Sequence, residues 1–103
     1  MLHLKNFGSL VLAGALLLPA RSGAQGAVDH VALGDREAAA FNSAAALTHY
    51  EAAVAASPRN GEALGKASRS AVDIGEQTAD GPQRTEYFRK GEQYARRAVE
   101  ASP

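Results

Sequence analysis

The sequence predicts an all-α protein in which four helices form two antiparallel hairpins. Three observations support this prediction. No segment alternates apolar and polar residues with the two-residue period of a β-strand. Apolar residues instead recur every three or four positions in four successive segments, which is the spacing of one helix face. The sequence Ala-Ser-Pro ends two of these segments, at 56–58 and 101–103, and proline cannot continue a helix.

The composition is that of one small globular domain and excludes several kinds of site. The chain has 103 residues, of which 46% are hydrophobic, and it has no cysteine. We therefore expect no disulfide, thiolate chemistry or cysteine-based zinc site. Because 11 basic residues balance 11 acidic ones, charge gives no reason to expect nucleic acid or an anionic membrane surface as a partner.

Residues 1–24 have the pattern of a secretory signal peptide. Lys5 precedes the uncharged run 7–18, and the small residues Ser22 and Ala24 follow. We place the cleavage between Ala24 and Gln25. The run is shorter than the roughly 20 apolar residues that span a membrane, so we expect a periplasmic or secreted protein without stable membrane insertion after cleavage. The alternative is an uncleaved N-terminal membrane anchor.

The first two helices are predicted over 28–40 and 43–56. Asp29 is expected to cap the first helix, because its short side chain accepts hydrogen bonds from the free N–H groups of the first turn. Three larger apolar residues lie along it: Val31, Leu33 and Ala38. The second helix carries one apolar stripe, formed by Ala46, Leu47, Tyr50, Ala53 and Val54. We expect this helix to end before Pro58.

The third helix is predicted over 61–76, with Asn60 as its cap. Its apolar face consists of Leu64, Ala67, Ala71 and Ile74. The fourth helix is predicted over 83–101, after a polar loop at 77–81, with Pro82 in its first turn. Its apolar face consists of Tyr87, Gly91, Tyr94, Ala95 and Ala98. On the opposite face, two pairs have the four-residue spacing of ion pairs, namely Glu86 with Lys90 and Glu92 with Arg96.

Segments 46–58 and 91–103 form an internal repeat. Both read as a small residue, a tyrosine, alanine, valine and then Ala-Ser-Pro, with the tyrosine offset by one position. Small residues let two helices approach closely, and one aromatic ring fills the space between them. The repeat predicts a unit at 25–103 that consists of two hairpins, 27–58 and 61–103.

This pattern resembles the tetratricopeptide repeat family. The matching residues in the first hairpin are Leu33, Gly34, Ala46, Tyr50, Ala53 and Pro58. In the second hairpin, Leu64, Ala67, Tyr94, Ala98 and Pro103 take the equivalent packing positions. His30 stands where the family usually has tryptophan, and Glu37 where it has an aromatic residue. The resemblance implies an α-solenoid whose hairpins stack on one another.

The second hairpin also resembles the repeat region of the regulator of microtubule dynamics proteins and their bacterial relatives. Segments 62–71 and 94–100 carry this likeness, which accounts for a unit longer than the standard period of about 34 residues. It implies the fold alone. Because stable arrays generally have at least three repeats, we also expect the chain to be the N-terminal piece of a longer protein.

One polar stripe is the candidate partner-binding site. Residues Glu62, Lys66, Arg69 and Asp73 recur every three or four positions on the third helix. In the tetratricopeptide family the first helix of each hairpin lines the concave groove, so the resemblance implies contacts from this stripe to a peptide or partner helix. The alternative interpretation is a solvated helix face with no partner.

The sequence gives no catalytic or metal-binding pattern, so we expect no enzyme activity and no cofactor. His30 and His49 belong to different helices without the spacing of metal ligands. Asp73 and Glu76 are interpreted as a solvated helix end. We therefore expect an exported scaffold that binds a protein or peptide. The alternative is an N-terminal module of a larger envelope protein whose activity lies downstream.

Overall fold

The structure, a computed structural model, describes residues 28–102. This part of the chain is all-α, with four helices, no strand and 83% of its residues helical, which confirms the predicted fold class. The predicted signal peptide, its cleavage site between Ala24 and Gln25, and Pro103 lie outside the described residues.

The four helices are close to their predicted positions. Their bounds are α2, His30–Ala39; α3, Ser43–Ala56; α4, Gly61–Gln77; and α5, Gly81–Ala101. The bounds of α3 are those predicted, and α4 is one residue longer. The largest differences are at the N-termini of α2 and α5, and capping residues account for both.

Each helix begins after an aspartate or asparagine whose side chain accepts a hydrogen bond from the first turn. The four pairs are Asp29 with Ala32 N, Asn42 with Ala45 N, Asn60 with Ala63 N, and Asp80 with Gln83 N. The predicted caps Asp29 and Asn60 are thus confirmed. Asp80 places the start of α5 at Gly81, two residues before the predicted start, with Pro82 in the first turn as expected.

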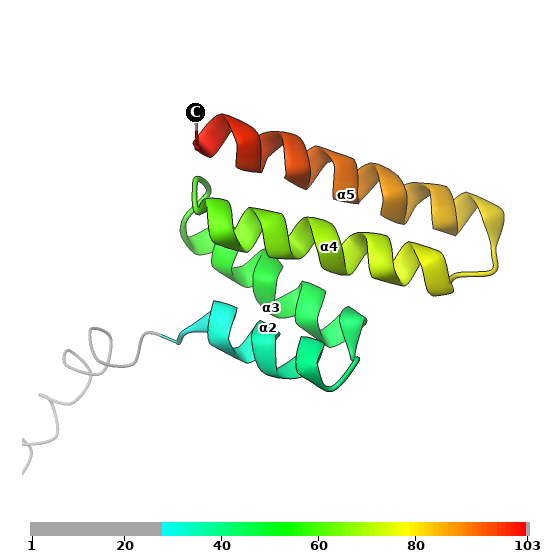
Figure 1. Cartoon of the computed structure of the whole chain (residues 1–103), viewed down its shortest axis with the longest axis horizontal. Helices are drawn as coiled ribbons and strands as arrows, with labels where there is room; N and C mark the ends of the chain where they lie inside the picture. The colour runs from blue at the N-terminus through cyan, green and yellow to red at the C-terminus, as the bar shows by residue number, and fades with distance from the viewer. Residues whose placement is uncertain (1–27, 103) are drawn as a thin grey trace, which may run out of the picture.

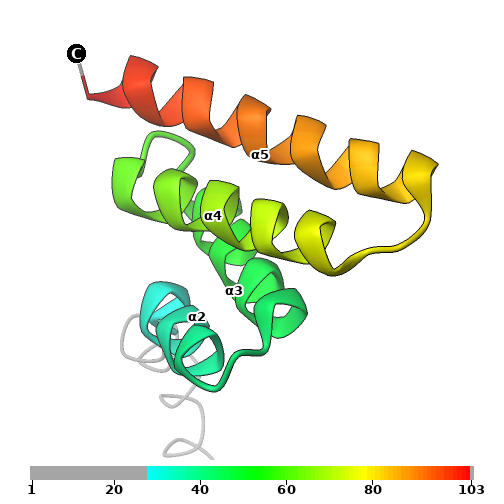
Figure 2. The same ribbon diagram turned by 45° about the vertical axis from the view of Figure 1, so that its right-hand side comes forward.

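Consecutive helices are antiparallel and pack side by side (Figure 1). Helix α3 contacts both α2 and α4, and α4 contacts α5 along much of its length. Helices α2 and α4 therefore lie on two sides of α3 and run in the same general direction, which Figure 2 shows from a second angle.

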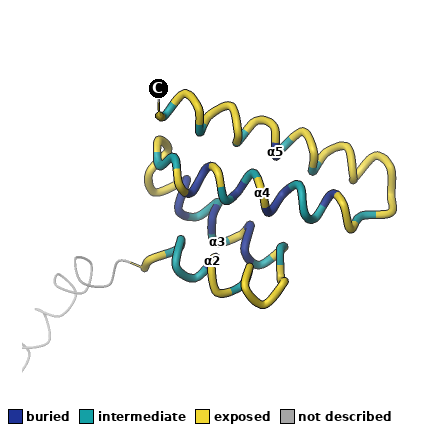
Figure 3. Tube along the Cα trace, viewed as in Figure 1, coloured by how far each residue is buried: buried dark blue, intermediate teal, exposed yellow. Residues whose placement is uncertain are grey.

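The core lies between α3 and α4, as the dark blue segments of Figure 3 show. Its buried apolar residues are Ala46, Leu47, Tyr50, Ala53, Val54, Ala63, Leu64, Ala67 and Ala71. The predicted stripe of α3 is therefore confirmed in full. On α5 only Gly91 is buried, and the prediction that Ala95 belongs to the packed face is wrong, because this residue is exposed. Ala38 is exposed as well, near the end of α2.

Glycines set the close approach of neighbouring helices. A Cβ atom added at Gly34 of α2 would lie 2.6 Å from Cδ1 of Tyr50 on α3. One added at Gly91 of α5 would lie 2.8 Å from Cγ2 of Val72 on α4. Ser68 of α4 also donates a hydrogen bond of 2.7 Å to the Gly91 carbonyl oxygen. These contacts require helix axes closer together than larger side chains would permit.

The residues predicted to pack the repeat lie at different depths. Buried members are Gly34, Ala46, Tyr50, Ala53, Leu64 and Ala67, whereas Leu33, Tyr94 and Ala98 are half-buried. Pro58 is exposed in the turn after α3. Its place fits its expected role, since it ends a helix without entering the core.

The turn between α2 and α3 contains a backbone feature that the sequence did not indicate. Phe41 has φ of 61°, in the left-handed region that favours glycine. The N–H of Asn42 donates to the carbonyl oxygen of Glu37 (2.8 Å), and that of Phe41 donates to Ala38 (2.9 Å). This pair of bonds is the Schellman arrangement, which satisfies carbonyl groups at the end of α2.

Candidate functional site

A groove of about 580 Å³ opens between the end of α2 and the face of α4. We call it the α2–α4 groove. Its walls include Ala38, Phe41, Tyr50, Lys66, Arg69 and Asp73. Helix α2 and the turn after it form one side, α4 forms the other, and Tyr50 of α3 lies between them. The groove thus combines residues from three helices.

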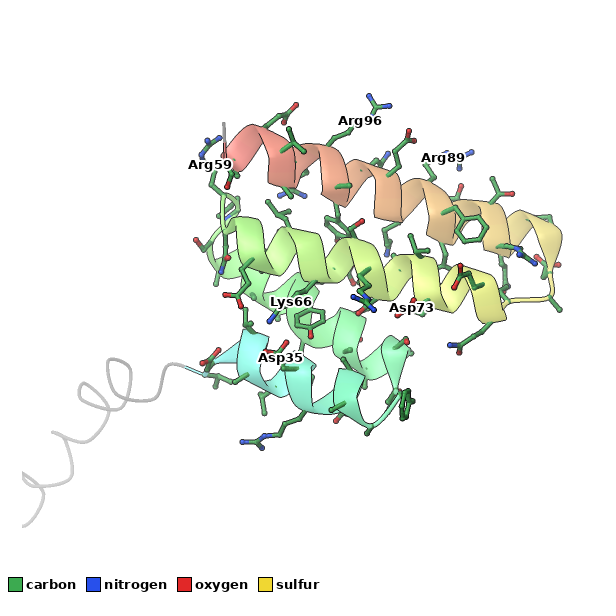
Figure 4. All side chains as sticks on the ribbon, in the orientation of Figure 1. Asp35, Arg59, Lys66, Asp73, Arg89 and Arg96 are labelled. Carbon is green, nitrogen blue, oxygen red and sulfur yellow. The ribbon has the colours of Figure 1, made fainter. Side chains whose placement is uncertain are left out.

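Three of the four residues predicted to contact a partner line this groove. Lys66, Arg69 and Asp73 do so, whereas Glu62 is exposed next to it and forms an ion pair with Lys66 (3.0 Å). They share one side of α4 because a helix turns once in 3.6 residues. Figure 4 shows Lys66 and Asp73 on α4, with Asp35 on α2 facing Lys66.

A hydrogen-bonded network includes two residues of the groove wall, Tyr50 and Lys66. The Tyr50 hydroxyl donates to Asp35 Oδ1 (2.6 Å), and Lys66 Nζ bonds both oxygens of the same carboxylate (2.9 and 3.0 Å). A residue from each of α2, α3 and α4 therefore meets at Asp35. Because Lys66 pairs with Asp35 of α2 and with Glu62 of α4, it links the two helices, and the three side chains together carry one net negative charge.

The network changes the acidity of its members. Hydrogen bonds from Tyr50 and Lys66 lower the pKa of Asp35, because they stabilise the carboxylate. Burial, and then the bond to Asp35, raise the pKa of Tyr50 to about 12. The hydrogen bonds to Asp35 and Glu62 raise the pKa of Lys66. At neutral pH the cluster consists of a carboxylate, a neutral phenol and an ammonium group.

Arg69 and Asp73 differ from Lys66, because neither forms an ion pair with a residue in 28–102. Arg69 is exposed and Asp73 is half-buried. They lie one turn apart on the same side of α4. The open part of the groove therefore presents one cation and one anion to a partner.

A second network of the same kind joins α3 to α5. The Tyr94 hydroxyl donates to Glu51 Oε2 (2.5 Å), which also accepts from Lys90 Nζ (3.2 Å). Burial and the bond to Glu51 raise the pKa of Tyr94 to about 12. The predicted pair of Glu86 with Lys90 is wrong, since Lys90 pairs with Glu51 and Glu86 with Arg89.

The predicted pair of Glu92 with Arg96 is confirmed at 3.0 Å. Both residues lie on the outer side of α5, away from the groove, where Figure 4 labels Arg89 and Arg96. These exposed arginines therefore provide positions for control substitutions in tests of the groove.

Asp35, Glu51 and Phe41 are the residues that sequence reasoning missed. The first two were hidden because the contacts that matter join residues 15 and 43 positions apart in the chain. Phe41 was given no role, since it falls between the two predicted helices 28–40 and 43–56. Its position directly after the last turn of α2, where glycine is common, was the available signal.

Two further features bear on chemistry. The rings of His30 and His49 are stacked, with centroids 5.9 Å apart, although the sequence placed them only on separate helices. In the described part of the chain, no group of three or more side chains of the metal-binding types converges on one point.

Across residues 28–102, no helix combines the length and apolar character required to cross a membrane.

Comparison with known proteins adds no relative, because no family model, curated protein or solved structure matches the chain. The functional interpretation therefore depends on the geometry of the groove and on the sequence patterns.

Proposed function

We propose that the chain is an exported scaffold of tetratricopeptide type, in which two stacked hairpins present the α2–α4 groove to a protein or peptide partner. The observation that supports this most is the groove itself. It lies between the first helices of the two hairpins and is lined by Arg69 and Asp73, whose charges the described fold leaves unpaired.

The composition of the groove favours a polypeptide over a small metabolite. Apolar surface from Ala38, Ala39 and Phe41 adjoins opposite charges from Arg69 and Asp73. Its walls come from α2, the turn after α2, α3 and α4. Grooves of this form suit an extended segment or a helix, whose side chains enter in a regular order.

Export is part of the proposal and depends on the sequence of residues 1–24. The uncharged run 7–18 and the small residues at 22 and 24 support cleavage after Ala24. The partner is then a periplasmic or extracellular protein. Mass spectrometry of the protein recovered from the periplasm or medium gives the mature N-terminus, and a start at Met1 would contradict cleavage.

An affinity capture from envelope extract tests the groove. The bait is the chain with Arg69→Glu and Asp73→Arg, which reverse the two unpaired charges and keep the Asp35–Lys66 network. The matched control is Arg96→Glu with Glu92→Arg, which exchanges a pair on the outer side of α5. We expect a partner captured by the unmodified chain to be lost with the groove variant and kept with the control. Equal capture by all three baits would remove the groove from the proposal.

A second candidate, an N-terminal module of a larger envelope protein, is favoured by the surface of α5. Gly91 is its only buried residue among those described, while Val99 remains 71% exposed. Such a face suits packing against a further hairpin. A reading frame that continues beyond Pro103 into another helical segment would support this candidate, and a stop codon at that point would exclude it.

A further inference from the structure

Phe41 occupies a backbone position that disfavours its own side chain. Its φ of 61° places it in the left-handed region, where a Cβ atom approaches the following carbonyl oxygen. The two Schellman hydrogen bonds at the end of α2 require this conformation. Glycine would satisfy the same bonds without the steric penalty.

The ring gains almost nothing from the fold in exchange. Phe41 is 91% exposed, the highest value among the exposed large hydrophobic residues of the described chain. The side chain therefore does not fill the core, and it makes no contact that would offset the cost of the positive φ. A strained residue that does not stabilise its own fold is a candidate for contact with another molecule.

The location of Phe41 gives that contact a direction. Phe41 is one of the residues that line the α2–α4 groove, next to Ala38 and Ala39. Because α2 and α4 run the same way in Figure 1, the turn after α2 lies toward the C-terminal half of α4. Asp73 lies toward that end of α4, followed along the helix by Arg69 and then by Lys66 of the Asp35–Lys66 network.

The spacing of the two charges matches an extended chain. Arg69 and Asp73 are four positions apart on α4, which corresponds to about 6 Å along the helix axis. Residues i and i+2 of a β-strand are about 6.6 Å apart and point to the same side. An extended peptide therefore meets both charges with alternate side chains.

We propose that Phe41 is the hydrophobic anchor of the groove, and that its partner is an extended peptide with an apolar, a basic and an acidic side chain at successive alternate positions. The apolar side chain packs on the Phe41 ring, the basic one pairs with Asp73, and the acidic one pairs with Arg69. This inference rests on the proposed function and specifies the chemistry of the partner.

The probes are short fluorescent peptides measured by anisotropy with the full chain. The matching peptide has the sequence Ser-Leu-Ser-Lys-Ser-Glu-Ser with blocked ends, and its reverse covers the opposite chain direction. One control peptide replaces leucine with serine, and another exchanges lysine and glutamate. We expect one of the two matching peptides to bind about tenfold more tightly than either control peptide derived from it.

Two substitutions separate the ring from the backbone. Phe41→Gly removes both the ring and the strain, whereas Phe41→Ala removes the ring and keeps a Cβ atom at positive φ. We expect each to weaken binding of the matching peptide about tenfold. Phe41→Gly should also raise Tm by roughly 4 °C or more, and Phe41→Ala should not. Val99→Ala, at an exposed apolar residue of α5, should leave binding unchanged.

The outcomes distinguish this inference from the proposed function. Unchanged binding in Phe41→Gly, with binding lost in Arg69→Glu, overturns the anchor and leaves the groove in place. No preference among the peptides overturns the proposed partner chemistry, while the capture experiment still tests the scaffold. A lower Tm in Phe41→Gly contradicts the strain argument. A dimer of the unmodified chain that Phe41→Gly dissociates overturns the inference in favour of a second copy.

Discussion

The ring of Tyr50 lies against the backbone of α2 at Gly34, where an added Cβ atom would come within 2.6 Å of its Cδ1 atom. The ring is 3% exposed, and its hydroxyl is bonded to Asp35 one residue further along α2. It is therefore held both by packing and by a polar contact. This relationship fixes the distance between α2 and α3, and with it one wall of the groove.

Gly34→Ala should destabilise the chain because the new methyl group overlaps the fixed ring. We expect the free energy of unfolding to fall by about 1–3 kcal/mol, the usual range for overpacking. Gly65→Ala is the matched control, since an added Cβ there meets nothing within 4 Å on an exposed helix face. It should stabilise by about 0.5–1 kcal/mol. Urea unfolding of both variants measures the contrast, and equal changes would show that the ring is free to move.

Tyr50→Phe tests the hydroxyl apart from the ring. It removes the 2.6 Å bond to Asp35 and leaves the packing in place. A hydrogen bond to a charged group contributes about 1.5–3 kcal/mol, but the Asp35 side chain is 47% exposed, so we expect a loss of about 1 kcal/mol. Tyr87→Phe, at a half-buried tyrosine on α5, should change stability by less than about 0.5 kcal/mol. If urea unfolding shows the same loss of stability in both variants, the hydrogen bond from the Tyr50 hydroxyl makes no particular contribution.

Alkaline pH should weaken the fold through Tyr50 and Tyr94. Burial, and then hydrogen bonds to carboxylates, raise the pKa of each to about 12 from 10.0. Because the folded pKa is above the unfolded one, this stabilisation is complete below pH 10 and is lost as the pH rises toward 12. The raised pKa of Lys66 acts in the same direction. The free energy of unfolding, measured by urea between pH 8 and 12, should fall across this interval.

The double variant Tyr50→Phe with Tyr94→Phe is the control for this prediction. It lacks both raised phenols, so its stability should fall less steeply above pH 10 than that of the unmodified chain. If the free energy of unfolding falls with the same slope in both proteins, the loss of stability at alkaline pH does not come from the two tyrosines.

Asn60→Ala should show how far one cap supports the second hairpin. The Asn60 side chain accepts a 3.0 Å hydrogen bond from Ala63 N at the start of α4. Replacing such a cap by alanine costs about 1 kcal/mol. Gln93→Ala, on the exposed side of α5, should have little effect. A cap variant as stable as this control, by thermal unfolding followed by circular dichroism, would contradict the assignment.

Local signals were sufficient to predict the helices. The three-to-four spacing from Ala46 to Val54 predicted both the bounds of α3 and its buried face, because each signal lies within one turn of helix. Errors at helix ends had a similar local cause. Asp80 was assigned to the polar loop at 77–81, but its side chain accepts a hydrogen bond from Gln83 N, so α5 starts at Gly81.

Contacts between helices were much less predictable. Lys90 was assigned to Glu86 by sequence spacing, but the packing of α5 on α4 brings its side chain to Glu51 of α3 instead. Asp35 had no local signal, since its partners lie on two other helices. The stripe on α4 did predict three residues of the groove wall, because one side of a helix is set by sequence alone. Which of them retain an unpaired charge depends on the neighbouring helices.

Site-specific photo-crosslinking tests the central claim, that the α2–α4 groove is the partner-binding face. A photoreactive phenylalanine derivative is placed at Gln77, which lines the groove, or at Arg96 on the outer side of α5. After irradiation in living cells, we predict a discrete adduct with one partner from position 77 and none from position 96. An adduct from position 96 alone, or the same adduct from both positions, would contradict the account.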